Sequence, residues 1–240
     1  APHEEGIERV FLGGSFAVSV MMRRHPSYEL VRTEFLNGWR KDLNGLEPPR
    51  VKRILQLNPS PDVEHRFNKY AQMVGNVRRL FHGTSTSSTC RFAIDLNSRP
   101  CIDESCNLCN ICRSSLLLRF AGAKQFGSGS AAMNLRFGRG LYFSPCSGKS
   151  NDYASGSGKL AQQMNGRKRT REEWRVMCVC TVALGKSFRT ENNMQGVTGP
   201  PSGCDSISGE VGAVLNYPEC VVYNDDAVCP KYLIVYAPPQ

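Results

Sequence analysis

The sequence of 240 residues lacks any long apolar run. A helix needs about 20 consecutive apolar residues to cross a bilayer, and the longest candidate, residues 10–22, is interrupted by two glycines and two serines. The segment before it carries Glu4, Glu5 and Glu8, which is the wrong charge for the basic start of a secretory signal. The sequence therefore predicts a protein with neither a membrane-spanning segment nor a retained signal peptide.

Acidic residues are in short supply, with 21 against 30 basic ones, and the net charge is +9 at pH 7. The excess lies in residues 113–190, which carry 14 basic and 3 acidic side chains, a net charge of +11. This favours an anionic partner such as a dinucleotide pyrophosphate or a nucleic acid, although a solvated basic face explains the same composition. The basic run at residues 167–171 lacks the interleaved aromatics that stack on bases. We interpret it as an exposed loop, with a nuclear import signal or a phosphate-binding segment as the alternatives.

Internal repeats of 20–50 residues are also missing, which excludes a solenoid, and a hydrophobic content of 40% excludes a disordered chain. Hydrophobic periodicity and apolar runs predict the helices and strands. The helices are expected over residues 26–41, 61–74 and 149–164, and the strands over residues 50–57, 76–82, 141–143, 174–184, 219–223 and 232–236. The segment rich in glycine and serine at 121–140 is interpreted as a functional loop. Few helices, short strands and long loops predict a single α+β domain.

Cysteines, in contrast, are abundant: there are eleven, an odd number, and five of them crowd into one short segment. A Cys-x-x-Cys turn lets two thiolates bind one metal ion, and two further cysteines complete a tetrahedral zinc site. We favour Cys90, Cys101, Cys106 and Cys109 as the metal-binding set, because Cys112 leads into an apolar, helix-like segment. Disulfide bonds in a secreted protein, with the fifth cysteine free, or unbound reduced thiols are the alternatives.

Three separated segments carry residues that could perform chemistry. They read LFHGT at 80–84, GRGLYF at 138–143 with GKSNDY shortly after it, and YPECVVY at 217–223. Taken singly, each has an ordinary structural explanation, since a histidine after a strand, a tyrosine within a strand and a glutamate at a strand end are all common.

Together and in this order, the three segments resemble the catalytic domain of the poly(ADP-ribose) polymerase family of ADP-ribosyltransferases. The family's His-Tyr-Glu triad falls on His82, Tyr142 and Glu219, and the resemblance extends over residues 26–238. It implies an α+β fold with a split, antiparallel-rich β-sheet core, flanking helices and an NAD cleft. Residues 1–25 would form an N-terminal extension, and residues 26–240 would form the catalytic domain with a Cys-rich insertion at about 88–113.

The resemblance also implies how NAD, the co-substrate, would be bound on the nicotinamide side. Tyr142 and Tyr153 would sandwich the nicotinamide ring, since flat aromatic side chains stack well on a flat ring. The backbone of Gly83 would hold the amide group through one donor and one acceptor, and the hydroxyl of Ser150 would add a donor.

On the other side of NAD, the resemblance assigns His82 to the adenosine ribose, with assistance from Thr84. Glu219 is the one anionic group of the set. It would polarise the 2′-hydroxyl of the nicotinamide ribose and stabilise the positive charge that develops when nicotinamide leaves.

The function that follows from the resemblance is transfer of ADP-ribose from NAD to a macromolecular acceptor, most simply a protein, with release of nicotinamide. Mono- and poly-ADP-ribosylation both stay open, because in the family a glutamate at this position is needed for chain elongation but does not guarantee it. The alternatives are an NAD glycohydrolase, a catalytically silent NAD or ADP-ribose reader, and a nucleic-acid-binding module. The expected location is the nucleus or cytoplasm, or outside the cell if the cysteines form disulfides. The oligomeric state stays open.

Overall fold

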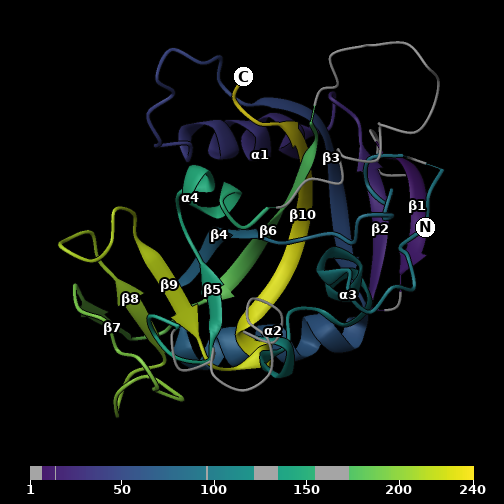
Figure 1. Ribbon diagram of the computed structural model, residues 1–240. Coiled ribbons are helices and arrows are strands. Elements are labelled where there is room, and N and C mark those ends of the chain that lie inside the picture. Colours follow the sequence, from purple (N-terminus) through teal and green to yellow (C-terminus); the bar gives the residue numbers. More distant parts are fainter. Residues whose placement is uncertain (1–6, 14, 96, 122–134, 155–172) are drawn as a thin grey trace.

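The computed structural model describes residues 7–13, 15–95, 97–121, 135–154 and 173–240, and Figure 1 shows their arrangement. Ten strands of this part form two sheets, and the helices pack around them. The α+β class and the antiparallel-rich sheets expected from the sequence are confirmed. Within the described residues, no helix combines the length and the apolar character that a membrane span requires.

The larger sheet has six strands in the order β1-β2-β3-β10-β6-β4, and all its pairings are antiparallel. The strands are β1 (Ile7–Gly13), β2 (Phe16–Met21), β3 (Arg50–Pro59), β10 (Val228–Ala237), β6 (Arg175–Ala183) and β4 (Val77–Gly83). The apolar strand predicted at 174–184 is β6, which lies between β10 and β4 as its two-sided apolar pattern indicates. Residues 1–25, expected as an extension, contribute β1 and β2, so this segment is continuous with the sheet.

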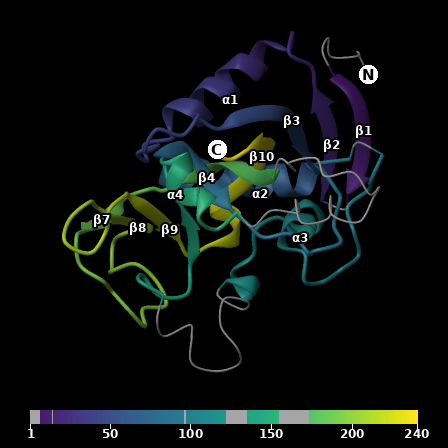
Figure 2. The same ribbon diagram turned by 45° about the horizontal axis from the view of Figure 1, so that its top comes forward.

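The smaller sheet has four strands in the order β5-β9-β8-β7, with a parallel pairing between β7 and β8. The strands are β5 (Leu141–Phe143), β9 (Glu219–Val222), β8 (Ser206–Gly209) and β7 (Ser187–Thr190). It lies at the end of the molecule opposite β1 and β2 (Figures 1 and 2). The two sheets meet where Phe81 of β4 pairs with Ser144, just after β5, through two backbone hydrogen bonds of 2.9 and 3.0 Å. This junction places the ends of β4 and β5 side by side.

Helices cover both faces of the larger sheet. Helix α1 (Pro26–Asn37) buries Tyr28, Val31 and Phe35 against one face, where Ile234 and Tyr236 of β10 join the same cluster. Helix α2 (Pro61–Val74) and helix α3 (Asn107–Ser114) pack on the other face. Side chains alternate across a strand, so β10 supplies neighbouring residues to the two faces.

The predicted helix ends agree with the structure for α2. The Ser60 hydroxyl accepts a hydrogen bond from the backbone N–H of Val63 at 3.5 Å, and Gly75 ends α2 with a φ of 73°. The helix predicted at 26–41 is too long, because α1 ends at Asn37 and the backbone N–H of Gly38 caps it by donating to the carbonyl oxygen of Glu34 at 2.9 Å. The third predicted helix differs as well. Helix α4 (Ser147–Asn151) is a short turn rather than the start of a helix extending through residue 154. The remainder of the helix predicted at 149–164 lies outside the described residues, as do the basic run and most of the predicted loop at 121–140.

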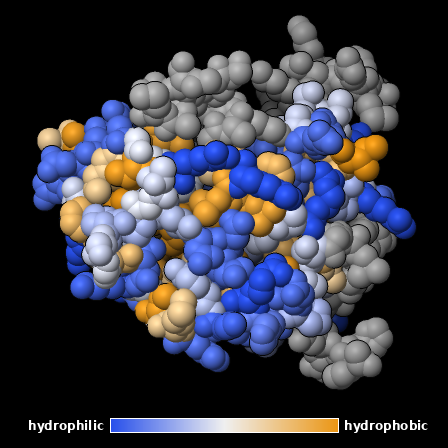
Figure 3. Space-filling model, turned by 90° about the horizontal axis from the view of Figure 1, so that it is seen from below, coloured by the Kyte–Doolittle hydropathy of each residue, from blue (hydrophilic) through white to orange (hydrophobic). Residues whose placement is uncertain are grey.

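The surface around α2 is largely hydrophilic, with small hydrophobic patches between the polar side chains (Figure 3). The helix turns Val63 and Phe67 inward, whereas Asp62, Glu64 and Arg66 face solvent. Helix α2 therefore contributes to the hydrophobic core and not to the site described below.

Candidate functional site

The residues of the predicted triad converge at the junction of the two sheets. His82 follows Phe81 near the end of β4, Tyr142 is the middle residue of β5, and Glu219 is the first residue of β9. The imidazole Nδ1 of His82 lies 2.9 Å from the carbonyl oxygen of Tyr142. The β5–β9 register sets Phe143 opposite Cys220, so Glu219 lies just beyond the end of β5. Three segments far apart in the sequence therefore contribute to one place in the structure.

The contact with the Tyr142 carbonyl fixes the tautomer of His82. A carbonyl oxygen can only accept, so Nδ1 carries the proton and Nε2 of the neutral ring is left as an acceptor. Burial lowers the pKa of His82, while the hydrogen bond to the carbonyl opposes that shift. A neutral ring with its Nε2 free to accept suits a ligand hydroxyl.

The hydroxyl of Tyr142 is hydrogen-bonded to the backbone of residues 137 and 138. It donates to the carbonyl oxygen of Gly138 at 2.8 Å and accepts from the backbone N–H of Phe137 at 3.0 Å. Burial is the main cause that raises the pKa of Tyr142, and the hydroxyl therefore stays protonated at neutral pH. The ring rather than the hydroxyl is left for contact with a ligand.

Glu219 forms an ion pair that the sequence did not reveal. Its Oε1 lies 2.8 Å from Nζ of Lys149, and the two side chains are only 9% and 16% exposed. Lys149 comes from α4 and also lies over the ring of Tyr153, with Nζ 5.9 Å from the ring centroid. The sequence shows a lysine followed by a serine at this position. It does not show which carboxylate the lysine would contact, because that depends on the tertiary structure. Because the lysine contacts Oε1, the second carboxylate oxygen is available to another partner.

Gly83, Ser150 and Tyr153 form a second group next to the triad. A Cβ atom on Gly83 would lie 1.8 Å from the carbonyl oxygen of Ser150 and 3.0 Å from Cβ of Tyr153. This close approach of β4 to α4 therefore requires glycine. The Tyr153 side chain is 46% exposed, which leaves ring surface for a ligand.

Ser150 is used differently from what the sequence led us to expect. Its buried hydroxyl donates to the carbonyl oxygen of Phe81 at 3.1 Å, so its hydrogen is already engaged. In this geometry the hydroxyl oxygen could accept from an amide, whereas the expected donor role requires the hydroxyl to rotate away from Phe81. Thr84, the remaining residue of the predicted NAD set, follows Gly83 and is buried.

The Gly83→Ala substitution is expected to destabilise the protein and to weaken nicotinamide binding together. A methyl group cannot fit between β4 and α4, and overpacking of this kind costs about 1–3 kcal/mol, or roughly 3–10 °C in Tm. Thermal melts and nicotinamide titrations check this, with Gly199→Ala as the control because a Cβ at Gly199 meets nothing within 4 Å. Wild-type melting and binding in Gly83→Ala would show that the described approach of β4 to α4 is wrong.

Four cysteines come together on the other side of the loop that follows Gly83. The sulfur atoms of Cys90, Cys101, Cys106 and Cys109 all lie within 4.8 Å of one another, and this group could hold a metal ion. Three of the side chains are buried, and that of Cys101 is half-buried. These are the four residues selected from the sequence. Cys112 stays outside the group and is buried, and that burial raises the pKa of its thiol.

The contacts among these thiols are compatible with a metal site. All eleven cysteines of the chain are described, and all are free thiols. Sγ of Cys90 and Sγ of Cys109 lie 3.6 Å apart, whereas a disulfide bond measures about 2.0 Å. Hydrogen bonds from the Cys109 and Cys90 thiols, then from the backbone N–H of Ser87, lower the pKa of Cys106. The backbone N–H of Cys101 donates to Sγ of Cys109 at 3.3 Å. Donors of this kind stabilise the thiolates that bind metals.

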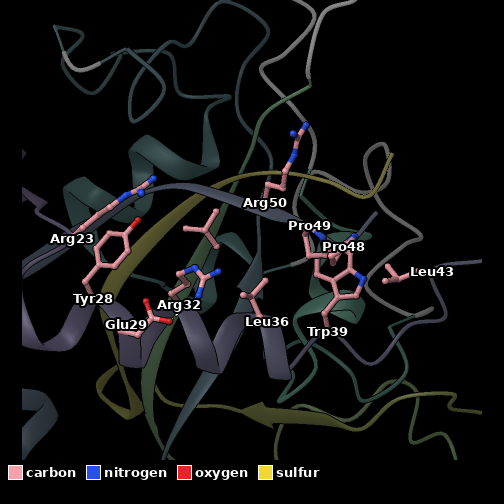
Figure 4. A pocket seen from close by; sticks show the side chains of 11 residues that line it. Arg23, Tyr28, Glu29, Arg32, Leu36, Trp39, Leu43, Pro48, Pro49 and Arg50 are labelled. Carbon is pink, nitrogen blue, oxygen red and sulfur yellow. Dashed lines mark hydrogen bonds and ion pairs between the residues drawn. The ribbon is translucent and has the colours of Figure 1, made fainter. Parts of the chain in front are cut away.

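A cavity of about 660 Å³ lies along α1 (Figure 4). It is lined by apolar and aromatic side chains, three arginines and one glutamate: Arg23, Tyr28, Glu29, Arg32, Leu36, Trp39, Leu43, Pro48, Pro49, Arg50 and Val51. None of the residues expected to bind NAD is among them. This cavity is therefore not the NAD cleft that the resemblance implies.

The chain matches no known protein-family model. The functional argument consequently depends on the residues of the site themselves.

Proposed function

We propose that the chain is an ADP-ribosyltransferase of the poly(ADP-ribose) polymerase type, which moves ADP-ribose from NAD to a macromolecular acceptor and releases nicotinamide. The observation that carries the proposal is the convergence of His82, Tyr142 and Glu219 at the junction of the two sheets. Lys149 on Glu219, and Gly83 against Ser150 and Tyr153, complete the arrangement.

Glu219 is suited to the chemical step. When the bond between nicotinamide and ribose breaks, the pyridinium leaves as a neutral molecule and positive charge develops on the ribose. The Lys149 ammonium pairs with one oxygen of the largely buried Glu219 carboxylate and fixes it, so the other oxygen can accept from the ribose 2′-hydroxyl. A carboxylate held in place before the reaction stabilises the developing charge without reorganisation.

The other residues bind and orient NAD in this proposal. Nε2 of His82 accepts from a hydroxyl of the adenosine ribose, with Thr84 beside it. The rings of Tyr142 and Tyr153 enclose the nicotinamide ring, and the backbone of Gly83 pairs with its amide group. The proposal thus assigns each of these residues a binding contact, whereas Glu219 alone acts on the ribose whose bond to nicotinamide breaks.

The test is to supply labelled NAD to the purified chain with acceptor proteins, and to compare nicotinamide released with ADP-ribose attached to protein. Equal amounts of both support the transferase, and the size of the attached product separates mono- from poly-ADP-ribosylation. Nicotinamide matched by free ADP-ribose would instead identify an NAD glycohydrolase. Binding of NAD without any release would identify a silent reader, and activity that requires added DNA or RNA would point to a nucleic-acid-binding role.

We also propose that the four-cysteine group holds a structural zinc ion. Soft thiolate ligands in a set of four suit zinc, and four protein ligands leave no open position for a substrate. Zinc would therefore stabilise the insertion and take no part in the chemical step.

The Tyr153→Ala substitution is expected to raise the Kd of NAD and of nicotinamide by a similar factor, roughly tenfold. Stacking acts on the ring common to both molecules and contributes about 0.5–1.5 kcal/mol beyond the area it buries. Calorimetric titration of both ligands measures the effect. Phe120→Ala serves as the control, since Phe120 is 50% exposed and lies outside the site. Unchanged nicotinamide affinity with lost turnover would mean that Tyr153 does not stack on the ring.

A further inference from the structure

A short loop joins the two groups of residues described above. Residues 84–87, here called the donor loop, begin right after His82 and Gly83 and lead to Cys90, the first thiol of the four-cysteine group. The β4 ladder ends at Gly83, which pairs with Met177 of β6. Beyond Gly83 the donor loop leaves the sheet, and yet Thr84 and Ser87 are 5% and 7% exposed. Something other than the sheet therefore holds this loop in place.

The first turn of α3 holds the middle of the donor loop. The backbone N–H of Leu108 donates to the carbonyl oxygen of Ser85 at 3.2 Å, and Nδ2 of Asn107 donates to its hydroxyl at 2.9 Å. Cys106 is the N-cap of the same helix, and Cys109 lies one turn further on. The residues that contact Ser85 are therefore flanked on both sides by thiols of the four-cysteine group.

The first cysteine of the group holds the end of the donor loop. The backbone N–H of Cys90 donates to the carbonyl oxygen of Ser87 at 3.1 Å. The position of Ser87 therefore depends on how Cys90 is placed.

We propose that metal binding by the four cysteines fixes the donor loop and thereby sets the affinity of the protein for the adenosine half of NAD. This inference rests on the proposed function, which assigns His82 and Thr84 to the adenosine ribose. Zn²⁺ holds four thiolates at fixed distances, and without it the four side chains are free thiols that contact one another only weakly. The contacts from Cys90, Asn107 and Leu108 to the donor loop then lose their fixed geometry.

The coupling between zinc and NAD acts in both directions, but it does not extend to the nicotinamide half of NAD. Because linkage is reciprocal, NAD must tighten zinc binding by the same factor by which zinc tightens NAD binding. The nicotinamide ring contacts Gly83, which the β4–β6 ladder holds, together with Ser150 and Tyr153 near α4. Zinc occupancy therefore affects NAD and ADP-ribose but leaves nicotinamide alone unaffected.

The experiment compares the zinc-loaded chain with the chain after removal of zinc by a chelator. We expect the Kd of ADP-ribose to rise about tenfold on zinc removal while that of nicotinamide stays constant. In the reverse direction, saturating ADP-ribose should slow or weaken zinc extraction by the chelator by a similar factor. Equal ADP-ribose affinity in the two forms, or an equal loss for nicotinamide, would overturn the proposal.

A pair of α3 variants tests the same idea in the zinc-loaded protein, which matters if zinc removal unfolds the chain. Asn107→Ala removes the hydrogen bond to Ser85 and no thiol, so ADP-ribose affinity should fall about threefold or more at full zinc content. Asn110→Ala is the matched control, because Nδ2 of Asn110 donates to the carbonyl oxygen of Glu104 and not to the donor loop. Indistinguishable affinities of these two variants would overturn the proposal.

Failure of this inference differs from failure of the proposed function. If the zinc-loaded wild type binds neither NAD nor nicotinamide, the proposed function is wrong and the coupling with it. If it binds both and releases nicotinamide, but its affinity for ADP-ribose does not depend on zinc, only the coupling is wrong.

Discussion

Glu219→Gln is expected to lower kcat for nicotinamide release by about 10²–10³-fold while the Kd of NAD changes little. Glutamine keeps the shape and the hydrogen-bonding capacity of glutamate and removes the negative charge that opposes the positive ribose. An interaction made mainly in the transition state affects kcat and kcat/KM together. Initial rates of nicotinamide release beside thermal melts measure the effect. Wild-type turnover in a folded Glu219→Gln protein would falsify the catalytic assignment.

The ion pair with Lys149 requires a control for this variant. Glu219→Gln leaves the largely buried Lys149 ammonium facing a neutral amide, which costs stability as well as activity. Replacing the lysine in the same chain, Glu219→Gln with Lys149→Met, removes the unpaired charge. We expect this double variant to regain much of the lost Tm and none of the lost turnover. Recovery of turnover would mean that Glu219 matters only as the partner of the lysine.

Cys106→Ala is expected to abolish zinc binding and to cause a large loss of stability, because it removes one of the four candidate ligands. Zinc binding free energy is also folding free energy, so loss of the ion should lower Tm by roughly 10 °C or more. Cys112→Ala is the control, because Cys112 is a buried thiol of the same helix that lies outside the group. It should retain one zinc per chain and lose only the packing of one sulfur atom. Elemental analysis and melts distinguish the two variants.

The outcome that contradicts the zinc site is also clear. The zinc site would be contradicted if wild-type protein purified without reductant contained no metal and its mass were lower by the hydrogens lost in disulfide formation. In that case Cys106→Ala and Cys112→Ala would still differ, but reductant rather than a chelator would reproduce the effect of the former.

Much of the larger sheet was predictable, because its central strands are buried on both faces and therefore consist mainly of apolar residues. The strand predicted at 174–184 is apolar on both faces and corresponds to β6, and the helix predicted at 61–74 corresponds to α2. Strands β7 and β8 were not predicted, since SFRT and SISG are short and lack apolar alternation. Their pairing depends on neighbours such as the hydroxyls of Ser187 and Ser206, which lie 2.7 Å apart.

The candidate site divides in the same way. The four-cysteine group was predictable in full, because the spacing of ligands on a loop and a tight turn is a local property. The triad came from a resemblance that depended on the order of three motifs. The Lys149–Glu219 ion pair and the bond from Ser150 to Phe81 could not be predicted, since each joins segments whose approach only the complete fold defines.

The junction at Phe81 and Ser144 divides the triad between the two sheets: His82 belongs to the larger one, and Tyr142 and Glu219 to the smaller. Under the proposed function, turnover therefore depends on whether the two sheets are docked. A molecule whose smaller sheet has locally unfolded keeps the six-stranded core and most of its secondary structure, but has no complete site. On gradual heating, loss of turnover should accordingly precede the main loss of circular dichroism, and the gap between the two temperatures measures how firmly the smaller sheet is held.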